Sequence, residues 1–250
     1  MIDLAGYRVV VTGGSRGIGA ACCRLFARAG AAVLVHYRSN GAAARAVVAE
    51  LPPASHPHLL FGADLAVEAE VAALFAHASE SWGGLDGLVN NAGVWTENPL
   101  PRLSLGGLRE TLEVNVVGPF LCARAAVPLL RSSADGSIVN LTSTAGQRGE
   151  ASCSPYAASK GAMISATKSW ASELAPEIRV NSVAPGWVDT DMTAEALAGP
   201  EREKVVAGIP LRRVATADDI AGPVLFLASP LARDITGEIL NVNGGSVLVG

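Results

Sequence analysis

Short apolar runs alternate with longer, alanine-rich helical patterns along almost the whole chain. The apolar runs are rich in Val, Ile and Leu and show no polar alternation, which is typical of parallel strands buried between two helix layers. The expected strands are Arg8–Val11, Ala32–His36, Leu59–Phe61, Gly87–Val89, Ser137–Leu141, Arg179–Val183 and Glu238–Val242.

Helical patterns fill the intervals between these strands. The expected helices are Gly17–Ala29, Ala42–Leu51, Glu68–Ser81, Leu105–Leu130, Tyr156–Leu174 and Ala217–Leu227. This order predicts an α/β, single-domain Rossmann fold with a doubly wound seven-stranded parallel sheet and helices on both faces. The crossovers are expected to be right-handed.

The regular alternation is interrupted once, at about residues 188–213. No repeat, low-complexity tract or linker divides the chain, so residues 1–250 are expected to form a single domain. The interrupting segment has no strand pattern but carries apolar residues such as Met192 and Leu211. Because it follows the carboxyl end of a strand, where such sheets bind ligands, we expect it to be a substrate lid. The alternative is an ordinary surface excursion.

Composition narrows the class of protein. Half of the residues are hydrophobic and 17% are charged, which favours a sizeable core and excludes general disorder. The net charge of −4 gives no basis for a nucleic-acid or membrane partner. No targeting segment and no apolar run of about 18 residues is seen, so a cytoplasmic protein is expected. The four cysteines lack zinc-ligand spacing, and no metal site is expected.

A glycine-rich turn, Thr12–Gly19, follows the first strand. Gly13 can adopt a turn conformation closed to other residues, Gly17 lets the backbone approach a pyrophosphate, and Gly19 lets the next helix pack close to the strand. The helix N-terminus then offers free N–H groups and a positive dipole end to phosphates. The turn therefore predicts dinucleotide binding, although its GxxxGxG spacing differs from the general GxGxxG fingerprint.

Three polar residues predict carbonyl chemistry. Tyr156 and Lys160 are four residues apart and share one face of a helix, and Ser143 ends a buried strand 13 residues before the tyrosine. Carbonyl reduction needs a proton donor at the oxygen, but a free tyrosine with a pKa of about 10 is a poor acid near neutrality. A nearby lysine cation would lower that pKa, and a serine hydroxyl would position the substrate oxygen.

With these motifs in place, the chain resembles the classical short-chain dehydrogenase/reductase family over nearly its full length, and most of all the family's 3-oxoacyl-thioester reductases. Seven segments in the expected order carry the resemblance. They are Thr12–Gly19, Asp64–Leu65, Asn90–Gly93, Asn115–Val116, Ser143, Tyr156–Lys160 and Arg179–Gly186.

The resemblance implies four catalytic roles. Tyr156 would be the general acid/base, and Lys160 would lower its pKa and hold the nicotinamide ribose hydroxyls. Ser143 would orient and stabilise the substrate oxygen. Asn115 would anchor a water that relays protons towards Lys160; the alternative is that Asn115 only holds backbone segments together.

The resemblance also implies a cofactor site. Asp64 and Leu65 would contact the adenine, and Asn91 would contact the ribose region or, alternatively, only hold the backbone. The full expected set is Gly13, Ser15, Arg16, Gly17, Ile18, Gly19, Tyr37, Arg38, Ser39, Asp64, Leu65, Asn91, Ala92, Gly93, Tyr156, Lys160, Pro185, Gly186, Val188 and Thr190.

The end of the second strand bears on the choice of cofactor. NAD-selective sites usually place an acidic residue there, but this chain has Tyr37 followed by Arg38. A guanidinium matches the geometry of a 2′-phosphate, and Arg16 would approach the same phosphate from the other side. NADP(H) is therefore the preferred cofactor and NAD(H) the alternative, unless both arginines are only solvated surface charges.

The substrate is expected to be a small carbonyl/alcohol compound, and a 3-oxoacyl thioester is the first candidate. Sugar and hydroxysteroid-type alcohols are the alternatives within the family, and a non-catalytic NADP-sensing module is the alternative outside enzymes. The resemblance implies a homotetramer, for which apolar Val247–Val249 and the small residues Ala157, Gly161, Ala162 and Ala166 supply contact surface.

Overall fold

A seven-stranded, all-parallel sheet forms the centre of the computed structural model, which describes residues 2–248. The strand order is β3-β2-β1-β4-β5-β6-β7, which confirms the predicted doubly wound Rossmann fold in a single domain. The strands are β1 Arg8–Val11, β2 Ala32–Tyr37, β3 Leu59–Gly62, β4 Gly87–Asn90, β5 Gly136–Leu141, β6 Ile178–Pro185 and β7 Ile239–Val242.

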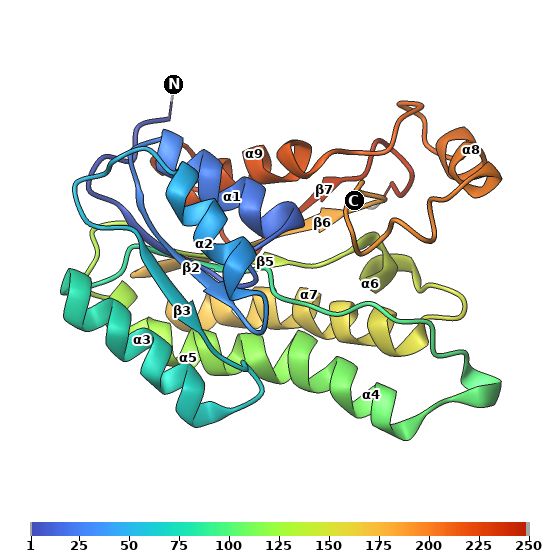
Figure 1. Ribbon diagram of the computed structural model, residues 1–250, viewed down its shortest axis with the longest axis horizontal. Coiled ribbons are helices and arrows are strands. Elements are labelled where there is room, and N and C mark those ends of the chain that lie inside the picture. The colour runs from blue at the N-terminus through green and yellow to red at the C-terminus, as the bar shows by residue number, and fades with distance from the viewer. Residues whose placement is uncertain (1, 249–250) are drawn as a thin grey trace.

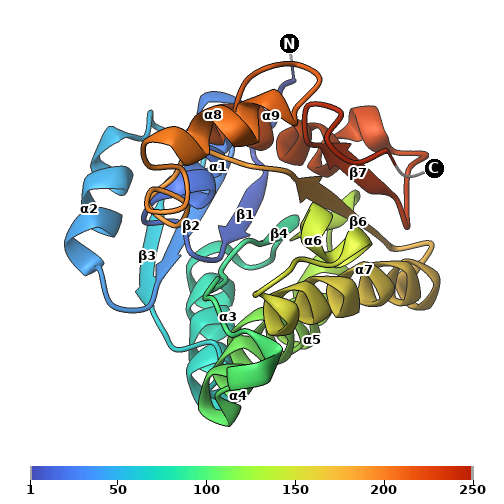
Figure 2. The same ribbon diagram turned by 90° about the vertical axis from the view of Figure 1, so that its right-hand side faces the viewer.

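Helices cover both faces of this sheet (Figures 1 and 2). One layer contains α1, α2 and α9, and the other contains α3, α5 and α7. The helices are α1 Gly17–Arg28, α2 Gly41–Glu50, α3 Glu68–Trp82, α4 Leu105–Leu112, α5 Gly118–Leu130, α6 Thr144–Arg148, α7 Ser154–Leu174, α8 Pro200–Ala207 and α9 Ala217–Ala228.

The two-residue period of the strands divides the core between these layers. In β1, Val9 and Val11 pack into the cluster beneath α1 and α9, while Val10 packs into the cluster beneath α3, α5 and α7. All three valines are fully buried, as expected for a strand between two helix layers. The unbroken apolar runs of the central strands are the sequence signature of this arrangement.

The helix expected over Leu105–Leu130 has a local irregularity. It runs as α4 and α5 joined by a π-helical turn, Glu113–Val117. Single π turns inside helices occur frequently at functional sites because they change the direction in which side chains project. Here the turn carries Asn115.

By length and composition the same Leu105–Leu130 helix is able to cross a membrane. Core helices of globular proteins meet the same test, and α5 packs its inner face on α3, β4 and β5. Charged residues such as Arg109, Glu113 and Arg124 interrupt this helix, so it is not an unbroken apolar run of about 18 residues.

The segment 188–213 is not a simple excursion without structure. It contains α8, which no sequence pattern indicated, and a small apolar cluster of its own. Leu197 and Ile209 are buried in this cluster, whereas Met192 and Leu211 are exposed. The segment therefore packs on itself above the carboxyl ends of the strands (Figure 2).

Candidate active site

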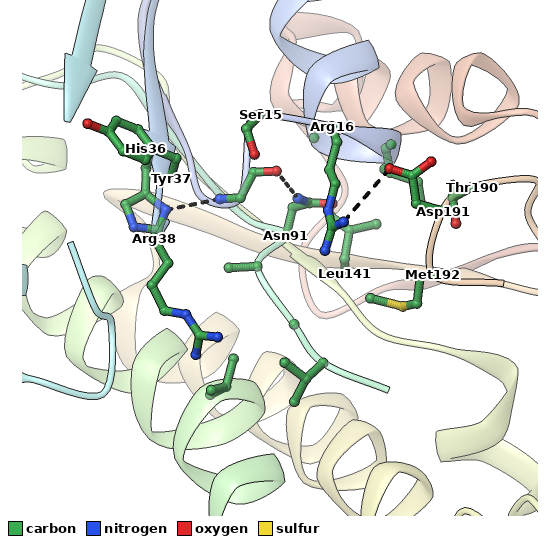
Figure 3. Close-up of a pocket in the computed structure, with 18 of the residues that line it drawn as sticks. Ser15, Arg16, His36, Tyr37, Arg38, Asn91, Leu141, Thr190, Asp191 and Met192 are labelled. Carbon is green, nitrogen blue, oxygen red and sulfur yellow. Dashed lines mark hydrogen bonds and ion pairs between the residues drawn. The ribbon is translucent and has the colours of Figure 1, made fainter. Parts of the chain in front are cut away.

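A cavity of about 440 Å³ lies at the carboxyl ends of β1 to β6 (Figure 3). It spans the point between β1 and β4 where the strand order reverses, which is where doubly wound sheets bind their ligands. All the residues expected to bind the cofactor line this cavity, and so does Ser143. Asn115 does not line it. The lining residues that sequence reasoning missed are His36, Asn40, Ala63, Val94, Val114, Leu141 and Thr142, whereas Asp191, Met192 and Thr193 belong to the segment expected to be the substrate lid.

The glycine-rich turn has the backbone geometry that its sequence demands. Gly13 and Gly17 have φ of 65° and 52°, in the left-handed region that favours glycine. A Cβ on Gly19 would lie 2.2 Å from the Gly13 carbonyl oxygen, so only glycine allows α1 to approach the strand this closely. The turn therefore places the N-terminus of α1 directly at the cavity.

The N-terminus of α1 is suited to an anion. No side chain caps it, and no acidic residue lies in its first turn. Its first N–H groups therefore remain available for phosphate oxygens, and the helix dipole adds a positive partial charge there. This free helix end beside Gly17 fits the pyrophosphate of a nicotinamide dinucleotide.

Asn91 stabilises this turn from the end of β4. Its Nδ2 donates to the carbonyl oxygens of Thr12, at 2.8 Å, and of Gly13, at 3.2 Å. The backbone N–H of Asn91 also donates to the Thr12 hydroxyl. These contacts are those of the alternative interpretation, in which Asn91 holds backbone segments together, although its side chain also borders the cavity.

His36 supports the same turn from β2 and was not singled out from the sequence. Its Nδ1 accepts from the Gly13 N–H at 3.0 Å, and its Nε2 lies 2.9 Å from the Ala63 carbonyl oxygen. Burial lowers the pKa of His36, while the Ala63 carbonyl and the Asp64 carboxylate oppose that shift. The imidazole is therefore neutral and joins the glycine turn to the loop that carries Asp64.

The two arginines expected at the adenosine end lie on different sides of the cavity. Arg38 is exposed after β2, whereas Arg16 extends from the glycine turn towards Asp191, in the segment after β6 (Figure 3). Arg16 Nη1 and Asp191 Oδ2 are 3.8 Å apart. At the end of β2, where NAD-selective sites usually carry an acidic residue, this chain has Tyr37. Its ring packs against Gly41 and Gly62.

Ser143, Tyr156 and Lys160 meet at the opposite end of the cavity. Ser143 lies two residues beyond the end of β5 and caps α6, where its Oγ accepts from the Ala145 N–H at 3.1 Å. Tyr156 lies in the first turn of α7, and Lys160 follows one turn later on the same face. The Lys160 Nζ lies 5.8 Å from the centre of the Tyr156 ring and donates to the Leu141 carbonyl oxygen at 2.7 Å.

The pKa shifts at this end arise mainly from burial. Burial lowers the pKa of Lys160 to about 8. Burial also raises the pKa of Tyr156, and a hydrogen bond from Ser143 opposes that shift. The structure thus differs from the expected lowering of the tyrosine pKa, because loss of solvent is the largest cause of the shift and the Lys160 ammonium donates to the Leu141 carbonyl.

Asn115 lies behind the cavity rather than in its wall. Its Oδ1 accepts from the Val94 N–H at 2.8 Å, and its Nδ2 donates to the Val94 carbonyl at 2.9 Å and to the Ser159 hydroxyl at 3.1 Å. A Cβ on Gly93 would lie 3.2 Å from this Oδ1. The side chain therefore ties the β4 loop to α7, and the expected role in holding a water remains a prediction.

Comparisons with known proteins agree with this geometry. A family model described as Enoyl-(Acyl carrier protein) reductase matches residues 13–246. A protein named 3-oxoacyl-[acyl-carrier-protein] reductase from Synechocystis sp. is 38% identical over 250 residues, covering 99% of this chain and 100% of that protein.

Solved structures show the same similarity. A short-chain dehydrogenase/reductase from Brucella melitensis, described as a glucose/ribitol dehydrogenase, superposes with a TM-score of 0.95 at 34% identity and covers 99% of both chains. A short-chain dehydrogenase from Burkholderia cenocepacia in complex with NADP superposes with a TM-score of 0.91 at 37% identity, covering 97% of this chain and 98% of the other. The chain therefore belongs to the short-chain dehydrogenase/reductase family and is an oxidoreductase acting on CH–OH or C=O groups.

Proposed function

We propose that this protein transfers a hydride between NADP(H) and a carbonyl/alcohol substrate, and that it is a reductase of 3-oxoacyl thioesters or related ketones. The observation that carries the proposal is one continuous cavity with the free N-terminus of α1 at one end and Ser143, Tyr156 and Lys160 at the other. A nicotinamide bound there would supply or accept the hydride. The remaining steps belong to the side chains of the chain itself.

Ser143 and Tyr156 both line this cavity, so two hydroxyl groups are available to one substrate oxygen. In the reduction, the Ser143 hydroxyl orients the carbonyl oxygen, and the Tyr156 hydroxyl donates its proton to that oxygen as negative charge develops. Lys160, buried behind the tyrosine, would hold the ribose hydroxyls of the cofactor, and its charge would offset the phenolate charge that forms on Tyr156.

The preference for NADP(H) follows from the end of β2. A carboxylate there would repel a 2′-phosphate, and Tyr37 stands in its place with the exposed Arg38 next to it. The relative from Burkholderia cenocepacia was solved with NADP, which supports the same choice. One charge-assisted hydrogen bond contributes about 1.5–3 kcal/mol, so a kcat/KM at least about tenfold higher with NADPH than with NADH is expected.

Steady-state kinetics with both cofactors test this preference. Arg38→Ala is expected to remove most of the NADPH advantage and to leave turnover with NADH nearly unchanged. Arg45→Ala, an exposed arginine of α2 outside the cavity lining, is the matched control and should leave the preference intact. Equal use of NADH and NADPH by the wild-type enzyme would contradict the proposed role of Arg38.

The substrate class is supported by the named relatives and by the segment over the cavity. The Synechocystis relative is named for 3-oxoacyl reduction, whereas the family model is described by reduction of an enoyl group. We favour the carbonyl reaction because Ser143 and Tyr156 place two hydroxyl groups in the lining of one cavity, where both can donate to a carbonyl oxygen. Met192 and Thr193 line the cavity from the 188–213 segment, which supports its proposed role as a substrate lid.

A turnover screen with NADPH separates these candidates. Acetoacetyl thioester and simple diketones are expected to be reduced, whereas a crotonyl thioester is expected to be inert. Sugars and steroids, assayed as alcohols with NADP⁺, represent the other candidate substrates. Reduction of the crotonyl thioester without reduction of any ketone would contradict the proposal.

A further inference from the structure

The segment Thr190–Thr193, which we term the strap, lies directly against the glycine-rich turn (Figure 3). A Cβ placed on Gly17 would lie 3.4 Å from Cγ2 of Thr190, so the Thr190 side chain lies beside the glycine-rich turn at the cavity. Asp191, the next residue of the strap, forms the 3.8 Å ion pair with Arg16 described above. The strap thus meets the turn at two neighbouring positions.

The backbone of the strap is fixed locally. The Thr193 N–H donates to the Thr190 carbonyl at 3.0 Å, and the Thr193 hydroxyl donates to the Val188 carbonyl. These bonds hold the Asp191 backbone in place without using its carboxylate. The Asp191 carboxylate at the cavity is therefore not needed to fold the strap.

The side chains of Arg16 and Asp191 remain free to separate. They are 68% and 74% exposed, and within residues 2–248 neither forms another ion pair. An exposed pair of this kind contributes little free energy and is easily exchanged for another partner. A phosphate is such a partner, because its oxygens accept from a guanidinium in the same way as a carboxylate.

We propose that Asp191 is a cofactor-selectivity residue that competes with the 2′-phosphate of NADP(H) for Arg16. The proposal rests on the NADP(H)-dependent function proposed above. In the structure Arg16 is turned towards Asp191 and away from Arg38, so phosphate binding by Arg16 requires this ion pair to break. Asp191 therefore weakens the binding of the phosphorylated cofactor selectively and limits the preference for it.

Asp191→Asn tests the proposal in a double-mutant cycle with Arg16→Ala, read out as the Kd of NADPH and of NADH by fluorescence titration at fixed salt. The Kd of NADPH is expected to fall about two- to fivefold in Asp191→Asn, the range that an exposed ion pair accounts for, and the Kd of NADH should stay within about twofold. In the Arg16→Ala background, the same substitution should have no effect on NADPH.

Asp189→Asn is the matched control. It removes a carboxylate two residues away that pairs with Arg202 at 2.6 Å and does not line the cavity, so NADPH affinity should be unchanged. The proposal would be overturned if Asp191→Asn increased the affinity for NADH as much as that for NADPH, increased NADPH affinity also in the Arg16→Ala background, or left NADPH affinity unchanged. Failure of the proposed function is distinguishable, because wild-type protein would then show no preference for NADPH in the same titrations.

Discussion

At the scale of single residues, the hydrogen bonds of His36 define its protonation state. Its Nδ1 accepts from the Gly13 N–H, so the ring proton must be on Nε2, which donates to the Ala63 carbonyl. A second proton on Nδ1 would place two donors face to face. The neutral ring is thus a condition for the observed position of the glycine turn.

The pH dependence of stability follows from this bond. Because burial lowers the pKa of His36, the folded state binds fewer protons than the unfolded state below the ordinary pKa of about 6.5. Stability is therefore lost as the pH falls from about 6.5 towards the lowered value. At neutral pH, His36→Asn is expected to cost about 1–3 kcal/mol, since the shorter Asn can accept from the Gly13 N–H but leaves the Ala63 carbonyl without the Nε2 donor.

The measurement is urea unfolding of wild type and variant between about pH 5 and 8, a range that brackets the titration. The difference between the two free energies of unfolding should shrink as the pH falls, because only the wild type pays for protonation of the ring. His56→Asn, in the loop before β3, should leave the pH dependence unchanged. A difference that is constant over this range would contradict the assignment.

Tyr156→Phe tests the proton donor directly. The ring and its packing are retained, but the hydroxyl that would protonate the substrate is lost, so kcat is expected to fall by about 10²–10⁴ while NADPH still binds. Turnover and NADPH fluorescence titration are the two measurements. Tyr7 lies just before β1, at the amino ends of the strands and away from the site. Tyr7→Phe removes a phenolic hydroxyl there and should leave kcat of the folded enzyme unchanged. Activity of Tyr156→Phe within about tenfold of wild type would exclude the role.

At the scale of elements, the second residue of β6, Arg179, holds the end of α9 in place. The Arg179 guanidinium donates to four carbonyl oxygens at and just beyond the end of α9, the closest being that of Leu227 at 2.7 Å, and it pairs with Asp135 at 3.1 Å. The cation satisfies carbonyls that the helix leaves without intrahelical partners, and its charge suits the negative end of the helix dipole. Arg179 thus joins the sheet to the α9 layer.

Arg179→Met is therefore expected to lower the free energy of unfolding by about 2–4 kcal/mol, since several buried carbonyls lose their donor. Arg24→Met removes a solvent-exposed pair with Glu50 and should cost less than about 1 kcal/mol. Urea unfolding of both variants provides the comparison. Similar losses for the two substitutions would show that the carbonyl cluster contributes no more than a surface ion pair.

The sequence predicted the elements that carry a local apolar pattern and missed those that do not. The strands and the six long helices follow from local apolar patterns, and their ends are correct to within about two residues. Helix α8 was missed because it buries no residue and shows no apolar stripe, and α6 because it is only five residues long. The π turn at Asn115 was missed because local propensity does not distinguish it from regular helix.

The residues of the candidate site also fall into two groups, those that sequence spacing places and those that only the packing of separate elements brings together. The glycine turn and Tyr156 with Lys160 were readable because spacing along one element places them. His36 was not, because it acts through Gly13 and Ala63, which only the packing of β2 between β1 and β3 brings within reach. The Arg16–Asp191 pair depends on a contact between segments far apart in the chain.

At the scale of the whole molecule, the outer face of the α5 and α7 layer exposes apolar side chains. Phe120 is 44% exposed and packs edge-on against the Trp170 ring, with 4.8 Å between ring centres, and Val117 beside it is 37% exposed. The small residues expected to form the contact surface contribute less, since Ala157 and Ala166 are buried within the subunit. Of the apolar C-terminus, Leu248 is exposed, while Val249 lies outside the described residues.

This apolar face is expected to be one of the contacts of a homotetramer, because exposed aromatic and aliphatic side chains on one helix layer favour association with a second copy. Light scattering at micromolar concentration should give a mass near four times 25.5 kDa. Phe120→Arg places a charge in the contact and should shift the distribution to smaller species, with a lower Tm that no longer rises with protein concentration. Leu231→Arg, which changes an equally apolar and 68% exposed residue beyond α9, should leave the mass unchanged. A wild-type mass near that of the monomer, or a tetramer that tolerates Phe120→Arg, would place the interface elsewhere or exclude it.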